Sequence, residues 1–163
     1  MDTQDKIMDI EKKILRTDKM IKKARSVRSL IITTIKNLDD KYTYSTSGFL
    51  RGNILGDFIR KSRVKSVNSN IDKVQDAMFK LEADLIIYDK DLAGALRLPA
   101  KMSQYGGADG LFSDIALRSN MRLKQFDVTK SLRNVETVIK RLKARKDRLR
   151  YDLKKNKELL EYK

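Results

Sequence analysis

The amino-acid sequence predicts an all-α fold, an elongated antiparallel three-helix bundle or coiled coil with a long basic C-terminal helix. Composition is the first reason: 36% of the 163 residues are charged, only 7% are aromatic, and Trp is absent. Such a chain is typical of long, solvated helices rather than of a thick globular core. Periodicity is the second reason, since apolar residues recur in alternating steps of three and four along most of the chain.

Three separate registers follow this repeat, and they divide the chain. They cover residues 7–38, 64–92 and 128–160. We therefore predict a single helical module over residues 1–163, with helices at 3–38, 57–92 and 113–161 and connectors at 39–56 and 93–112. A 3.5-residue repeat over at least three heptads favours coiled-coil packing. Amphipathic helices in an ordinary bundle, where the period drifts toward 3.6, are the alternative.

The connectors carry the residues that interrupt helices. The first is rich in Ser, Thr, Asn and Gly, and the second contains Pro99 and the run GGADG at 106–110. These residues favour turns. If each connector reverses the chain, the simplest product is an antiparallel bundle in which the last and longest helix overhangs the other two.

The last helix has a predicted seam with which it contacts partner helices. Its residues are Val128, Leu132, Val135, Ile139, Leu142, Leu149 and Leu153. Arg28, Lys146 and Asn156 are polar residues at core positions of their registers, where they either fix the register or mark places where the seam opens to solvent. For Lys146 and Asn156 we favour the second interpretation. Heptads do not decide whether this helix packs within the chain or against another copy, so a homo-oligomer is possible.

Positive charge is concentrated in this same helix. The chain has a formal net charge of +15, and ten of the eighteen residues in KRLKARKDRLRYDLKKNK at 140–157 are basic. The candidate polyanion-binding residues are Lys140, Arg141, Lys143, Arg145, Lys146, Arg148, Arg150, Lys154, Lys155 and Lys157. A second basic cluster covers residues 12–28. The alternative is a solvated helix face. Well-ordered pairs of these cations with acidic residues at i, i+4 are scarce, however, and this excess of positive charge favours an anionic ligand.

Catalysis is not expected. The chain contains neither His nor Cys, which excludes the commonest general base, thiol nucleophiles and thiolate metal sites. Asp89 and Asp91 form a DxD pair of the kind that binds hard cations, but Asp is also common at helix ends. We therefore expect no cofactor, no metal and no small-molecule substrate.

The function predicted from these features is that of a non-enzymatic coiled-coil interaction and assembly protein. Its basic C-terminal helix would dock a polyanion, with nucleic acid as the leading candidate and without base-specific readout. The alternative is an adaptor, scaffold or virion-type structural component that binds an acidic protein. A membrane-surface role would rest on the amphipathic segment 48–61, for which core packing is the commoner explanation. Neither a signal peptide nor a transmembrane segment is apparent, so we expect a cytoplasmic or intracellular location.

Overall fold

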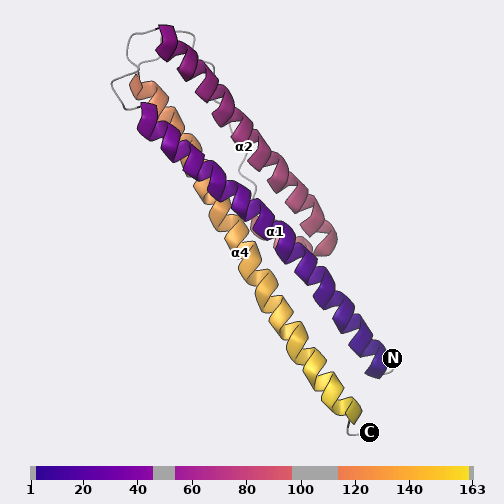
Figure 1. Cartoon of the computed structure of the whole chain (residues 1–163). Coiled ribbons are helices and arrows are strands. Elements are labelled where there is room, and N and C mark those ends of the chain that lie inside the picture. Colours follow the sequence, from indigo (N-terminus) through magenta and orange to yellow (C-terminus); the bar gives the residue numbers. More distant parts are fainter. Residues whose placement is uncertain (1–2, 46–53, 97–113, 162–163) are drawn as a thin grey trace.

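A computed structural model describes the secondary structure of residues 3–45, 54–96 and 114–161, and the side chains of residues 3–37, 69–96 and 128–161. The helices are α1 (Thr3–Ser45), α2 (Ile54–Tyr88), α3 (Lys90–Leu96) and α4 (Asp114–Glu161). No strand occurs in these ranges, which confirms the all-α class. The three long helices form an elongated molecule with both termini at one end (Figure 1).

Ion pairs between α1 and α4 show in which direction α4 runs relative to α1. Arg28 contacts Glu136, and further along the pair Lys157 contacts Glu11. As the residue number rises in one helix it falls in the other, so α1 and α4 are antiparallel. The first turns of α1 therefore accompany the last turns of α4, and the predicted overhang of the last helix is shared by two helices.

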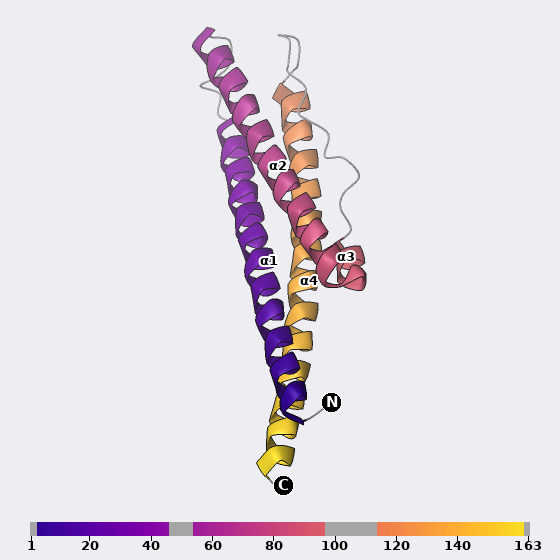
Figure 2. The ribbon, with the colours of Figure 1, turned by 90° about the vertical axis from the view of Figure 1, so that its right-hand side faces the viewer.

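Contacts between α1 and α2 show a second antiparallel pair. Lys23 binds Asp84, and the hydroxyls of Thr17 and Tyr88 lie 2.7 Å apart. Since α2 and α4 both run opposite to α1, they run parallel to each other (Figure 2). The prediction that both connectors reverse the chain is thus wrong for the second one. Heptad patterns do not encode helix direction, so this could not be predicted from them.

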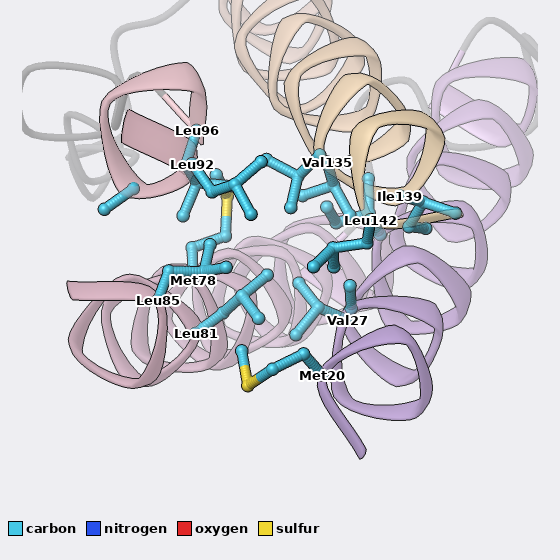
Figure 3. Close-up of a cluster of buried hydrophobic side chains, with 14 of the residues drawn as sticks. Met20, Val27, Met78, Leu81, Leu85, Leu92, Leu96, Val135, Ile139 and Leu142 are labelled. Carbon is cyan, nitrogen blue, oxygen red and sulfur yellow. The ribbon is translucent and has the colours of Figure 1, made fainter. Parts of the chain in front are cut away.

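The hydrophobic core lies where α1, α2, α3 and α4 all meet (Figure 3). From α2 it takes Ile71, Val74, Met78, Leu81 and Leu85, each a member of the predicted 64–92 register. None of these five side chains is more than 2% exposed. The strict repeat in α2 therefore marks its buried face correctly along the part of the helix whose side chains are described.

The core face of α1 departs from its predicted register. Arg28, at a core position of that register, is exposed, and its Nε donates a hydrogen bond to Glu136 at 2.9 Å. Of the two alternatives for Arg28, it marks a place where the seam opens to solvent. Val27 is buried instead, at 8% exposure. α1 packs against α2 and α4 on adjacent faces, so its buried strip is wider than a single seam and shifts around the helix.

Asp89 interrupts the predicted helix 57–92. α2 ends at Tyr88, and the Asp89 carboxylate accepts hydrogen bonds from the backbone N–H groups of Asp91 and Leu92 at 2.9 and 3.2 Å. This is the geometry of an N-terminal cap, and it starts α3 in a new direction. Helical structure therefore continues to Leu96, where we predicted a connector from residue 93.

The end of α2 divides the molecule into two regions. We call the region in which α2 covers α1 and α4 the core region. Beyond Thr17 and Arg145, which both lie level with Tyr88, α1 and α4 continue as a pair with no third helix among the described residues (Figure 2). We call this pair, residues 3–16 and 146–161, the arm. It extends roughly 20 Å at 1.5 Å per residue, and none of its side chains is buried.

Several predictions fall outside the described residues. They concern residues 46–53 and 97–112 of the two predicted connectors, and the side chains of the amphipathic segment 48–61, of the register positions Leu38, Val64 and Val67, and of the first turns of the predicted helix 113–161. Both ends of the predicted connector 39–56 are helical, because α1 continues to Ser45 and α2 begins at Ile54.

Candidate polyanion surface and adjoining groove

The predicted seam of α4 is mostly buried in the core region and only half-buried in the arm. Val128, Val135, Ile139 and Leu142 belong to the hydrophobic core. The other three members, Leu132, Leu149 and Leu153, are half-buried. Val138 and Ser131 are also buried, although the 3,4 register did not include them. In this chain the seam packs mainly against α1, with α3 against the neighbouring part of α4.

Four of the ten predicted polyanion-binding residues lie in ion pairs. They are Arg145 with Asp89, Lys146 with Asp18, Lys154 with Glu158, and Lys157 with Glu11. The Lys146 contact is close, at 2.5 Å, and its side chain is only 18% exposed. Lys154 and Glu158 are looser, at 3.8 Å. Lys146 therefore lies neither in the apolar seam nor free in solvent, but in an interhelical ion pair.

Arg145 has a structural role at the junction of three helices. Besides its ion pair with Asp89, its guanidinium lies over the ring of Tyr88, 5.2 Å from the centroid. Burial raises the pKa of Asp89, but hydrogen bonds from Leu92, Arg145 and Asp91 outweigh it and hold that pKa below its usual value. Arg145 therefore fastens α4 to the capped turn between α2 and α3.

The other six predicted residues are exposed, and none has an ion pair among the residues that the structure describes. We call them the outer cation surface: Lys140, Arg141, Lys143, Arg148, Arg150 and Lys155. Arg141, Arg148 and Lys155 recur every seven residues, so they share one side of α4. They span about 21 Å along the helix. Tyr151, 70% exposed, lies between Arg148 and Lys155 on that surface.

A groove of about 710 Å³ opens where α2 ends, between α1 and α4. Its lining includes five cationic side chains and a single carboxylate. These are Lys13, Arg16, Lys19, Lys23 and Arg145, with Asp84. Met20, Tyr88 and Leu149 contribute apolar surface, and Ile87 contributes a side chain that is 88% exposed. Four of the cations belong to the basic cluster at 12–28, which the sequence revealed, but only the fold shows that they surround a groove.

Not all of these cations are free to meet a ligand. Lys23 binds Asp84 at 2.6 Å, and Lys13 binds Asp9 at the same distance. Arg16 and Lys19 are exposed, and neither contacts a carboxylate of a described residue. These two cations carry the unneutralised charge of the groove.

Within the described ranges, no group of three or more acidic side chains is placed to hold a metal ion. The DxD pair is accounted for locally, since Asp89 caps α3 and binds Arg145. Over the same part of the chain, no helix is long and apolar enough to cross a membrane. Comparison with protein-family models, with curated proteins and with solved structures gave no match.

Proposed function

We propose that this protein is a non-enzymatic interaction protein that binds a nucleic-acid backbone through the outer cation surface. The observation that carries the proposal is the set of six exposed cations on α4 that have no ion pair in the described part of the chain. On a neutral helix surface these residues would be paired with acids at i, i+4. Unpaired cations along a straight helix can contact phosphates and release their counterions.

The character of this surface favours phosphates over a protein partner. Protein interfaces are centred on buried apolar or aromatic anchors. Tyr151 is the one exposed aromatic side chain that lies between the cations of the outer cation surface. A single Tyr can stack on one base, but it is not a stacking platform. Recognition would therefore depend on charge and shape, without base-specific readout.

α1 gives α4 its support. In the proposed bundle or coiled coil, the apolar side of α4 packs mainly against α1, which holds the helix straight over the span of the cations. Asp147 and Asp152 lie within the same stretch and lower its net charge, so we expect moderate affinity with a strong salt dependence. An adaptor or scaffold that uses this surface for an acidic protein is the alternative.

The test is a salt series of binding to duplex DNA, single-stranded DNA and RNA, with heparin as the polyanion control. The triple variant Arg141→Gln/Arg148→Gln/Lys155→Gln should lower the slope of log K against log salt by roughly two to three units for duplex DNA. The matched control is Lys12→Gln/Lys22→Gln/Arg25→Gln, which removes the same charge from exposed positions on α1. An equal loss in both variants, or heparin binding as tight as nucleic acid at matched charge, would refute a defined site.

A further inference from the structure

We propose that the groove at the end of α2 is a docking site for an acidic amphipathic helix of a partner protein. This site is separate from the outer cation surface, because it faces the end of α2 and is lined mainly by α1. The inference does not depend on nucleic-acid binding. It rests on an unfilled helix position, on the charge around that position and on an exposed apolar side chain at its entrance.

The unfilled position follows from the lengths of the helices. In the core region α2 lies against α1 and contributes Leu81 and Leu85 to the core. Past Tyr88 no described residue takes the place of α2, yet α1 and α4 continue together for roughly 20 Å. Leu149 lines the groove there and Leu153 follows one turn later, and both are only half-buried. A helix that continued the line of α2 would cover them.

Charge indicates what kind of helix would fit. Five cations and one carboxylate line the groove, and Lys23 already neutralises that carboxylate. Acidic side chains on the partner would pair with Arg16 and Lys19. A second copy of this chain is a poor occupant, because a net charge of +15 opposes self-association. The charge complementarity therefore favours a foreign acidic helix over a dimer.

An apolar anchor on the partner is also required. Ile87 is the most exposed large hydrophobic residue among the described ones, at 88%, and it lies in the lining next to Tyr88. A free anion or a phosphate backbone would gain nothing from it. A helix with an apolar stripe between acidic flanks would bury Ile87 and Leu149 together, as helix-in-groove complexes do.

The first experiment measures binding of a fluorescent, helix-forming peptide of about 21 residues, with Leu at 3,4 spacing and Glu on the flanking positions. The same peptide with Lys in place of Glu is the ligand control. Arg16→Glu/Lys19→Glu should weaken binding of the acidic peptide by about tenfold or more. Arg141→Glu/Arg148→Glu carries the same change in charge on the outer cation surface, and should weaken it less than about threefold, through long-range charge alone.

The second experiment separates apolar docking from general attraction between opposite charges. Ile87→Ser should weaken binding of the acidic peptide by about fivefold, because the contact with the apolar stripe of the peptide is lost. Phe79→Ser is the matched control, since Phe79 is exposed at 47% elsewhere on α2. Circular dichroism of each variant verifies that the helices are intact.

Three results would overturn the inference. In the first, both charge-reversal variants lose the same affinity, which would reduce the effect to net charge. In the second, the Ile87→Ser variant binds the acidic peptide as tightly as the unmodified chain does. In the third, sedimentation shows a dimer that the acidic peptide dissociates, which would make a second copy the natural occupant. None of them bears on nucleic-acid binding, whose own variants lie at Arg141, Arg148 and Lys155.

Discussion

The core region and the arm are built from the same two helices, α1 and α4, yet they differ in burial. In the core region Ala24, Ile31, Val135 and Leu142 are fully shielded from solvent. In the arm, no residue of the same helices is buried, although Ile7, Ile10, Ile14, Leu149 and Leu153 continue the same heptads. The difference is the third helix, because α2 ends at Tyr88 and α3 packs against α4 in the core region. A regular seam in a sequence therefore marks a face suited to packing, and the neighbouring helices decide whether that face is closed.

The largest contrast is expected from one substitution made in each region. Leu142→Ala should lower the free energy of unfolding by about 3 kcal/mol, because it leaves a cavity in a closed core. Leu153→Ala, at a seam position in the arm, should cost less than about 1 kcal/mol because its site is partly solvated. Urea denaturation followed by circular dichroism measures both. Equal losses would mean that the arm is as closed as the core region.

The boundary between the two regions should depend on Asp89. Asp89→Ala removes the cap of α3 and the partner of Arg145, and should cost about 1 to 2 kcal/mol. Because the folded pKa of Asp89 lies below its unfolded value of about 3.9, the charged carboxylate stabilises the fold above that pH. That contribution is lost as pH falls through the folded pKa.

Stability measured from pH 7 down to about pH 2 checks this prediction. The difference between the unmodified chain and Asp89→Ala should narrow toward the acid end. A gap that stays constant, or that widens in acid, would show that the carboxylate charge contributes nothing at this junction.

A smaller effect on stability is expected at the contact between the C-terminal end of α2 and α1. Tyr88→Phe removes the partly buried hydrogen bond to Thr17 and should cost about 1 kcal/mol. Tyr151→Phe is the control in the arm, because that Tyr is 70% exposed and should be neutral within about 0.3 kcal/mol. Thermal unfolding separates the two variants. A neutral Tyr88→Phe would indicate that the end of α2 is loosely attached.

The smallest effect on stability is expected from the ion pair that joins the two helices of the arm. Lys157 and Glu11 are about half exposed and lie 3.0 Å apart. A double-mutant cycle of Lys157→Ala and Glu11→Ala should give a coupling below about 0.5 kcal/mol that disappears in high salt. A coupling above about 1.5 kcal/mol would show that charge, rather than the half-buried leucines and isoleucines, holds the arm together.

Much of the fold could be predicted from the periodicity of the sequence. Where the prediction is wrong, the error has a physical cause. The register of α2 predicted its buried face correctly, because this helix presents one narrow face to the core. The register of α1 opens to solvent at Arg28 and does not include the buried Val27, since α1 packs on two neighbours and its buried strip widens. The break at Asp89 was missed because the apolar repeat continues through it to Leu92. The Asp itself, a strong capping residue, was the available signal.

The sites were predictable in composition but not in geometry. The basic stretch 140–157 was evident, yet only the packing of α1 and α3 on α4 separates paired cations such as Lys146 from free ones such as Arg148. The groove could not be found from sequence, because it depends on where α2 stops relative to Thr17. Residues far apart in the chain meet there, and helix direction was not encoded in the heptads.

Residue-resolved amide hydrogen exchange of the free chain tests the division into core region and arm most directly. In α4, protection should be highest between Val128 and Leu142 and should fall by about tenfold or more past Leu149, with a matching fall in α1 before Thr17. The step in both helices should lie level with Tyr88. Uniform protection along α4 to its last turns would contradict the account, because it would mean that the arm is closed without a third helix.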